Sequence, residues 1–205
     1  MQPVRLVDTM AIHRIIEQHA ALRGDAPALA DRQGTLTYRD LNQRANAVAR
    51  CLIAHGFRRG ATAVINRPRS LDLAVMCVGV LKAGGAFAWL DGDSSWPHGI
   101  SVLQGDDTDD ELQVLAIDVS GALAPRALSS PNLPILTRGS DIACVIGKIG
   151  GRSILVPHAT ITSLQAKPGG QQTPWSDEPG ALDLLVGLVA GATVMMAPAQ
   201  ALNAA

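Results

Sequence analysis

Residues 35–97 read TLTYRDLNQRANAVARCLIAHGFRRGATAVINRPRSLDLAVMCVGVLKAGGAFAWLDGDSSWP, and this stretch decides the fold. Thr37 can cap a helix, and Asp40 three residues later completes a weak capping box. Apolar residues then recur every three or four positions, which is typical of one buried helix face: Leu41, Ala45, Val48, Ala49, Leu52 and Ile53. His55-Gly56 should end this helix, because glycine accepts the left-handed conformation of a helix stop.

The same stretch contains a second helix pattern between two strand patterns. Residues 61–65 and 86–90 are short apolar runs typical of buried strands. Between them, Ser70 can cap a helix that is apolar on nearly all sides and stops at Gly84-Gly85. Such a helix is buried rather than amphipathic. Helices alternating with buried strands predict an α/β domain.

Two further elements are expected before this stretch. Residues 9–23 show a helical pattern with Ile12, Ile15, Ile16 and Ala20 on one side. Residues 28–30 and 35–37 flank a polar turn and predict a hairpin. His13 and His19 fall near the apolar face of the first helix, but no third ligand is placed to join them. We therefore expect ordinary helix histidines and no metal site.

Composition narrows the class of protein. The 205 residues allow one sizeable core, and 47% hydrophobic with 17% charged residues is typical of a globular chain. A net charge of −1 gives no electrostatic reason to expect nucleic acid or an acidic membrane as a partner. No apolar run is long enough to span a bilayer and no signal peptide is recognisable, so we expect a cytoplasmic protein. The three cysteines lie apart in apolar segments and are expected to be buried thiols.

Four runs in the first half resemble the opening part of nonribosomal peptide synthetase adenylation domains, members of the adenylate-forming (AMP-binding) superfamily. The runs are LTYRDLN (residues 36–42), RAN (44–46), PRS (68–70) and LKAGGAF (81–87). None of them carries catalytic side chains. The resemblance implies the N-terminal part of the superfamily's large domain, a mixed sheet flanked by helices. It also implies a truncated domain over residues 1–205, without the C-terminal half and the small lid domain.

Residues 147–153, GKIGGRS, stand where the resemblance places the phosphate-binding loop. The flanking residues 141–146 and 156–158 match the family's strands, and the family's loop resembles T-S-G-S-T-G-x-P-K-G. Backbone amides and hydroxyls of such a loop cradle phosphates. Here the loop is shorter and keeps one hydroxyl, so we interpret it as vestigial. Its candidate residues are Gly147, Lys148, Gly150, Gly151, Arg152 and Ser153.

Lys148 and Arg152 keep positive charge, so this loop can still attract an anion. A nucleoside-triphosphatase loop, G-x-x-x-x-G-K-[ST], is the other interpretation of the same residues. It fits poorly, because Arg152 stands where a lysine is needed and a strand follows instead of a helix.

The segments after residue 98 match the family less closely. Residues 104–111, QGDDTDDE, lack the alternating ligands of a calcium loop and predict a solvated acidic loop. Strands are expected at residues 112–117 and 133–136, and a loop at 121–134. Between residues 158 and 175 the chain is too short for the family's usual helix and strand, and a loop at residues 167–174 is expected in their place.

Residues 182–198 resemble the family's next helix and strand, and just before them the family places an acidic contact to the substrate's amino group. Counting back implies Glu178 for that contact, and the alternative is a polar loop before the helix. Val194-Met195-Met196 is expected to be an unpaired strand, which would favour a dimer or a stable hetero-complex. The family's ribose-binding Asp and catalytic Lys have no counterpart among residues 1–205.

Three functional interpretations follow. The first is a non-catalytic scaffolding or interaction module in nonribosomal peptide biosynthesis, without a cofactor, that docks a condensation-type or carrier-containing synthetase protein. The second is a fragment of an amino-acid-adenylating enzyme, using ATP and Mg²⁺, that is active only with a complementing chain or within a larger synthetase. The third is a decayed gene product with no role. Retention of the loop at residues 147–153 would favour the enzyme.

Overall fold

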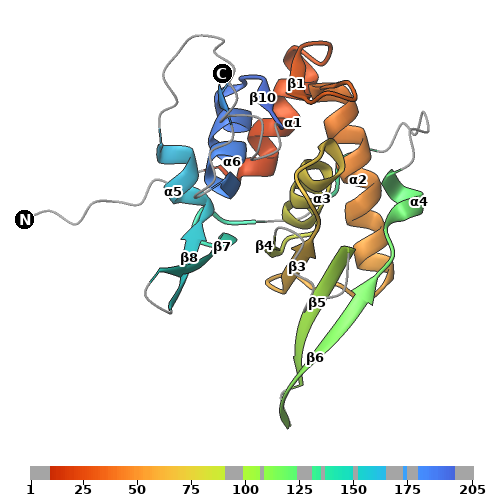
Figure 1. Ribbon diagram of the computed structural model, residues 1–205, viewed down its shortest axis with the longest axis vertical. Helices are drawn as coiled ribbons and strands as arrows, with labels where there is room; N and C mark the ends of the chain where they lie inside the picture. The colour runs from red at the N-terminus through yellow and green to blue at the C-terminus, as the bar shows by residue number, and fades with distance from the viewer. Residues whose placement is uncertain are drawn as a thin grey trace, which may run out of the picture.

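The computed structural model describes residues 10–90, 99–106, 109–123, 131–134, 137–149, 152–164, 173–174 and 180–196 (Figure 1). The helices are α1 (Ile12–Leu22), α2 (Tyr38–Ala54), α3 (Leu71–Lys82), α4 (Ser120–Leu123), α5 (His158–Ser163) and α6 (Gly180–Ala190). The strands are β1 (Pro27–Ala30), β2 (Thr35–Thr37), β3 (Thr62–Asn66), β4 (Ala86–Leu90), β5 (Gly99–Asp106), β6 (Asp109–Ile117), β7 (Ile142–Ile149), β8 (Arg152–Pro157), β9 (Thr173–Pro174) and β10 (Val194–Met195).

The larger sheet has the strand order β6-β5-β3-β4-β7-β8. Its central strands β3, β4 and β7 are parallel, whereas β5, β6 and β8 pair in antiparallel register. The predicted mixed sheet flanked by helices is therefore confirmed. The smaller sheet, β2-β1-β10-β9, joins the N-terminal hairpin to strands near the other end of the chain.

Helices α2 and α3 lie side by side (Figure 1), with α3 against β3 and β4 of the larger sheet and α2 against β1 and β2 of the smaller one. Gly79 of α3 permits this approach, because a Cβ at that position would lie 2.5 Å from Val48 Cγ1 of α2. Residues 73–82 of α3 are all buried, as the apolar pattern on every side of this helix predicts. The core of the domain therefore forms around the stretch of sequence that carries these two helices.

Both predicted helix starts are confirmed. The Asp40 N–H donates to Thr37 Oγ1 at 3.1 Å, and the Thr37 N–H donates back to Asp40 Oδ2 at 3.3 Å. This reciprocal pair is a complete capping box at the start of α2. At the start of α3, the Leu73 N–H donates to Ser70 Oγ at 3.2 Å. Each cap satisfies a backbone donor that has no partner within its own helix.

The prediction of an acidic loop at residues 104–111 is wrong. β5 runs to Asp106 and β6 starts at Asp109, with Asp106 opposite Asp109 in a long hairpin. The register begins with Ile100 opposite Ile117 and continues outward, so pairing overrides the low strand preference of the acidic residues. Residues 112–117 form a strand as predicted. Residues 133–134 do not, and residues 135–136 lie outside the described structure.

The prediction that residues 194–196 form an unpaired strand is also wrong. β10 lies between β1 and β9 and is parallel to both, with Val194 opposite Leu29 and Thr173. α5 and β9 lie at residues 158–163 and 173–174, within the interval predicted to be too short for the family's usual helix and strand, and residues 165–172 lie outside the described structure. β1 precedes β10 by more than 160 residues, and no local pattern reveals such a pairing. The reason given for a dimer therefore falls away.

Candidate functional site

The parallel strands β3, β4 and β7 end at the same edge of the larger sheet. Val64 lies opposite Ala88, and Ala88 lies opposite Val145, so the three carboxyl ends point the same way. In open α/β sheets, ligands bind outside the carboxyl ends of parallel strands. This edge is therefore the candidate functional site.

The residues predicted as a phosphate loop lie at this edge, although largely within strands. β7 continues through Gly147 and Lys148, and Ile149 lies opposite Arg152 of β8. The predicted loop over residues 147–153 is therefore wrong in its bounds, because the antiparallel pairing of the flanks extends toward the turn. Ser153 is an exposed residue of β8. Gly150 and Gly151 lie outside the described residues, as do the side chains of Lys148 and Arg152.

The predicted amino-group contact, Glu178, also lies outside the described residues. α6 begins after it at Gly180 and carries Asp183 in its first turn. In the part of the chain that the structure describes, no group of three or more His, Cys, Asp or Glu side chains is placed to hold a metal ion.

An aromatic and two arginines at this edge were not predicted as site residues. Trp89, next to the end of β4, donates its Nε1–H to the Arg67 carbonyl at 2.8 Å. The Arg69 guanidinium carbon lies 5.3 Å from the centre of the Trp89 ring, within the range of a cation–π interaction. Arg69 lies in the run PRS (residues 68–70), which the sequence analysis assigned to the fold and not to a site.

Two shallow pockets of about 530 Å³ each lie at opposite ends of the parallel strands. The pocket at the candidate edge is lined by Arg67, Pro68, Met76, Gly99, Ala116, Ile117, Asp118, Val119 and Ser120. The other pocket lies at the amino ends of the strands and contains the Arg59–Asp141 ion pair, at 2.9 Å. Burial opposes ionisation of Asp141, but hydrogen bonds from the Arg138 N–H and from Arg59 lower its pKa.

A buried ion pair lies away from both pockets. Lys82 Nζ donates to Glu17 Oε1 at 2.5 Å, and the two side chains are 0% and 8% exposed. Arg14 contacts the same carboxylate at 2.9 Å. Desolvation lowers the pKa of Lys82 to about 8, although Glu17 opposes this shift. Lys82 lines neither of these two pockets, and the pair joins α1 to α3, so we assign it to the packing of these helices.

His13 and His158 form a second buried polar contact. Their rings meet edge to face with centres 6.1 Å apart, and the Ile12 N–H donates to His158 Nδ1 at 3.2 Å. Burial lowers the pKa of His13 to about 3 and that of His158 to about 4, so both rings are neutral at pH 7. His158 was not expected to contact His13, because the two residues are far apart in sequence.

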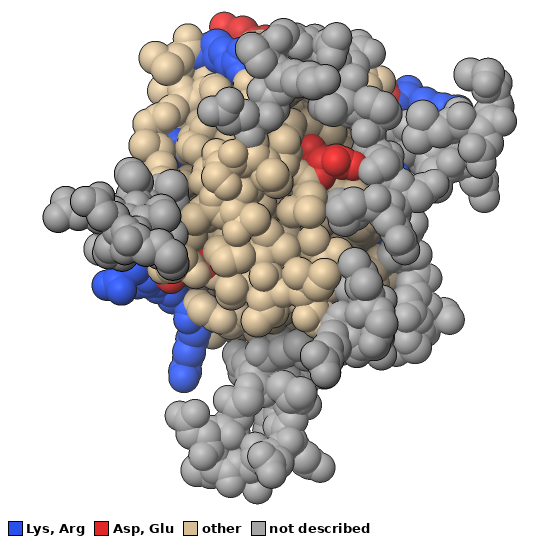
Figure 2. All heavy atoms as spheres, turned by 90° about the vertical axis from the view of Figure 1, so that its left-hand side faces the viewer, with Lys and Arg blue, Asp and Glu red and all other residues tan. Residues whose placement is uncertain are grey.

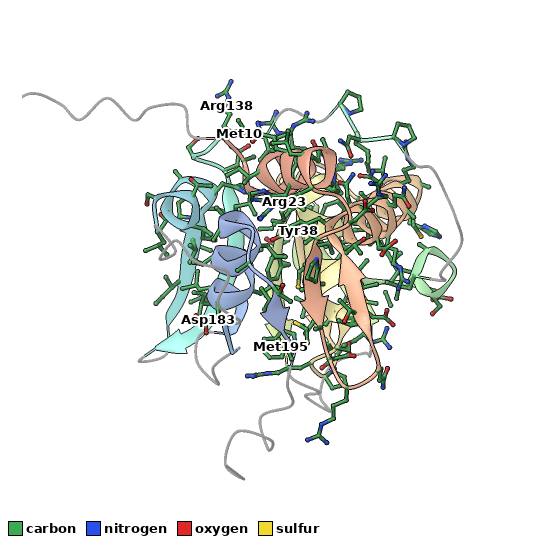
Figure 3. All side chains as sticks on the ribbon, turned by 90° about the horizontal axis from the view of Figure 1, so that it is seen from above. Met10, Arg23, Tyr38, Arg138, Asp183 and Met195 are labelled. Atoms are coloured by element: carbon green, nitrogen blue, oxygen red, sulfur yellow. The ribbon has the colours of Figure 1, made fainter. Side chains whose placement is uncertain are left out.

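A group of side chains from the N-terminal part holds the end of α6, as Figure 3 shows for Arg23 and Tyr38. The Tyr38 hydroxyl lies 3.2 Å from the Leu188 carbonyl and 2.9 Å from that of Ala192. His19 Nε2 bonds to the Val189 carbonyl at 2.9 Å, and Arg23 donates to that of Gly191. These donors bind carbonyls at the end of α6 and just after it, where helix carbonyls lack the usual partner four residues on, and they favour the negative end of the helix. His19 therefore has a structural role.

The family model described as "AMP-binding enzyme" matches residues 16–98 of this chain. Among curated proteins, bacitracin synthase 1 of Bacillus licheniformis is 30% identical over 159 residues, 72% of this chain and 3% of its own length. Surfactin synthase subunit 2 of Bacillus subtilis (strain 168) is 30% identical over 182 residues, 80% of this chain and 5% of its own length. The chain therefore spans only a small part of these relatives.

The solved structures with a similar fold include the N-terminal subdomain of Klebsiella oxytoca NpsA in complex with 3-hydroxyanthranilyl-AMSN. It matches with a TM-score of 0.70 and 18% identity, over 93% of this chain and 54% of that chain. A second is NpsA-ThdA, an artificially fused adenylation-PCP di-domain from the same organism, with a TM-score of 0.68 and 18% identity. It covers 93% of this chain and 40% of that chain.

The sequence matches and the shared fold agree with the runs at residues 36–46 and 81–87. No helix among the described residues is long and apolar enough to cross a bilayer. The chain belongs to the AMP-binding enzyme family and corresponds to the N-terminal part of a nonribosomal peptide synthetase adenylation domain.

Proposed function

We propose that this chain is a non-catalytic adenylation-type module that acts in nonribosomal peptide biosynthesis by docking other synthetase proteins. One observation carries the proposal: β7 and β8 pair as far as Ile149 and Arg152, with a register shift between Ile146 and Ile149. A phosphate cradle needs several consecutive backbone N–H groups turned toward the ligand. Here only two residues, Gly150 and Gly151, separate the paired positions in sequence.

The fold itself is intact despite this short turn. The capping box of α2, the mixed sheet and the buried helix α3 are all present among the described residues, so the features that hold the fold together do not depend on a phosphate cradle. A protein that binds other proteins needs a stable folded surface. It does not need the charged groups that an enzyme holds in place to stabilise a transition state. We propose a condensation-type or carrier-containing synthetase protein as the partner, in the cytoplasm and without a bound cofactor.

A second candidate function is a fragment that adenylates an amino acid, with ATP and Mg²⁺, when further polypeptide completes it. The extent of the structural match favours this function. The match covers only 54% of the NpsA N-terminal subdomain, as expected if further polypeptide is needed to complete the enzyme. Lys148 and Arg152 would then contact the phosphates of ATP, and Glu178 the amino group of the substrate. Both candidate functions place the chain in contact with synthetase polypeptide.

Docking can be tested by affinity capture of the tagged full-length chain from its native cells, with proteins identified by mass spectrometry. We expect enrichment of condensation-type or carrier-containing synthetase proteins relative to the tag alone. The reason is that the adenylation-type fold is present while the phosphate-binding turn is short. We therefore expect the surface that binds other synthetase proteins to be better preserved than the site that binds ATP. Capture without any synthetase protein would contradict the docking function.

A further inference from the structure

The pocket at the candidate edge, where β3 and β6 end, combines an apolar floor with a polar rim. On the floor, Met76, Ile117 and Val119 are 1%, 5% and 3% exposed. The rim is exposed or half-buried and consists of Arg67, Pro68, Gly99, Ala116, Asp118 and Ser120. An apolar centre within a polar rim is typical of a site at which another protein anchors.

The backbone of Arg67 is tied to β4 by two hydrogen bonds. The Arg67 N–H donates to the Leu90 carbonyl at 3.2 Å, and the Arg67 carbonyl accepts the Trp89 Nε1–H at 2.8 Å. Pro68 follows, and its ring limits the conformations open to both residues. Ser70 Oγ donates to the Pro68 carbonyl at 3.3 Å and caps α3. The segment that carries Arg67 is therefore ordered before a partner binds, which lowers the cost of forming a complex.

The guanidinium of Arg67, by contrast, has no hydrogen-bond or ion-pair partner among the residues that the structure describes. Arg67 is half-buried at the rim. Arg59 in the other pocket differs, because it already pairs with Asp141 at 2.9 Å. A partly desolvated cation is favoured by an acceptor, and carboxylates are the protein groups that match the fork of a guanidinium. The pocket therefore offers a positive charge beside an apolar floor.

Asp118 adds one carboxylate to the rim, but it forms no ion pair with Arg67. Its Oδ1 accepts the Ser120 N–H at 2.8 Å, and hydrogen bonds from Ser120 lower its pKa. Asp118 is exposed, so water and salt screen its charge more than that of the half-buried Arg67. A single carboxylate therefore fits the rim better than a polyanion such as nucleic acid, which Asp118 repels.

The shape of the pocket favours a protein segment over a small molecule. Small-molecule sites bury about 70–90% of their ligand. This pocket is shallow, and Pro68, Ala116 and Ser120 on its rim are exposed, so a small molecule would stay largely in water. Figure 2 looks at another side of the molecule, which carries α5 and α6. Among the described residues it shows Lys and Arg only toward the margins, so that side offers no similar cation within an apolar surface.

We propose that this pocket, here called the Arg67 pocket, anchors a segment of the docked synthetase protein in which an Asp or Glu stands next to a large apolar residue. The carboxylate binds the Arg67 guanidinium, and the apolar side chain packs on Met76, Ile117 and Val119. This inference rests on the proposed function, because the segment belongs to the protein that this chain docks. The charge orients the segment, and burial of the apolar side chain supplies most of the affinity.

Site-specific photocrosslinking in the native cells tests the position and the chemistry of this contact. The photoreactive residue p-benzoylphenylalanine is placed at Ala116 on the rim, and in a matched control at Ala54, an exposed residue of α2 that lines neither pocket. We expect several-fold more adduct at residue 116, in a synthetase peptide with an Asp or Glu beside a large apolar residue. Equal adducts at both positions, adducts between two copies of this chain, adduct peptides without a carboxylate side chain, or no adduct would overturn the assignment.

Two substitutions separate this inference from the proposed function. Arg67→Gln removes the charge and Ala116→Trp fills the pocket, and each should reduce capture of the synthetase protein about fivefold or more. The matched controls Arg58→Gln and Ala54→Trp, at exposed positions outside the pocket, should leave capture unchanged. Arg67→Gln should also make capture less sensitive to salt, because an ion pair is lost.

Thermal unfolding checks that the four variants fold, as expected because the Arg67 guanidinium has no described partner and the other three positions are exposed. Undiminished capture by either Arg67→Gln or Ala116→Trp would overturn the Arg67 pocket while leaving the docking function in place. Absent capture by the unsubstituted chain would remove both.

Discussion

Replacing Lys82 with methionine should lower the free energy of unfolding by about 3 to 5 kcal/mol, the cost of leaving one partner of a buried ion pair alone. Lys82 is fully buried and its Nζ lies 2.5 Å from Glu17 Oε1. In the variant, the Glu17 carboxylate stays 8% exposed with Arg14 as its remaining charged contact. That contact places the expected loss toward the lower end of the range.

The double variant Glu17→Leu/Lys82→Met should be more stable than Lys82→Met alone, because no charge is then left buried. Arg59→Met is the matched control: it breaks an ion pair whose side chains are 50% and 32% exposed, and should cost less than about 1 kcal/mol. Urea unfolding followed by circular dichroism measures all three. A Lys82→Met loss no greater than that of Arg59→Met would contradict the role assigned to the buried pair.

Stability should fall steeply as the pH decreases from about 6.5 to 4. Burial lowers the pKa of His13 to about 3 and that of His158 to about 4, below the ordinary value of 6.5 that applies after unfolding. In this window the unfolded chain binds protons that the folded chain does not, so each lowering of pH favours unfolding. Each histidine contributes up to about 1.4 kcal/mol per pH unit.

The measurement is the free energy of unfolding in urea at a series of pH values between 7 and 4. His13→Leu should make the free energy of unfolding depend less steeply on pH, by the contribution of one histidine, because Leu binds no proton in either state. This holds whatever the substitution does to stability at pH 7. A slope that is the same in both proteins would show that His13 is protonated in the folded chain and that its burial has been misjudged.

The sequence predicted the elements whose signals are local. Thr37 and Asp40 cap α2, and the apolar sides of α3 predicted its burial, because caps and periodicity depend on residues a few positions apart. Contacts between distant residues left no such signal. The Lys82–Glu17 pair spans 65 positions and the Tyr38–Leu188 hydrogen bond 150, and neither could be read from spacing.

At the candidate site, too, local patterns were predicted from the sequence and features that depend on distant residues were not. The apolar patterns at residues 141–146 and 154–158 predicted strands where β7 and β8 lie, although His158 begins α5. The bounds of the turn between them were missed, since they depend on the register that places Ile149 opposite Arg152. The acidic hairpin at residues 104–111 was missed for the same reason: its pairing is set by Ile100 and Ile117 several residues away.

Amino-acid-dependent exchange of labelled pyrophosphate into ATP tests the absence of catalysis most directly. Adenylation needs a phosphate cradle and preorganised charge at the reacting phosphate, and one such group contributes about 10²- to 10³-fold in rate. With the proteinogenic amino acids and common aryl acids as substrates, we expect no exchange above background from this chain. A clear exchange signal that disappears in Lys148→Ala and Arg152→Ala would contradict this, and the adenylating fragment would replace the docking module as the function.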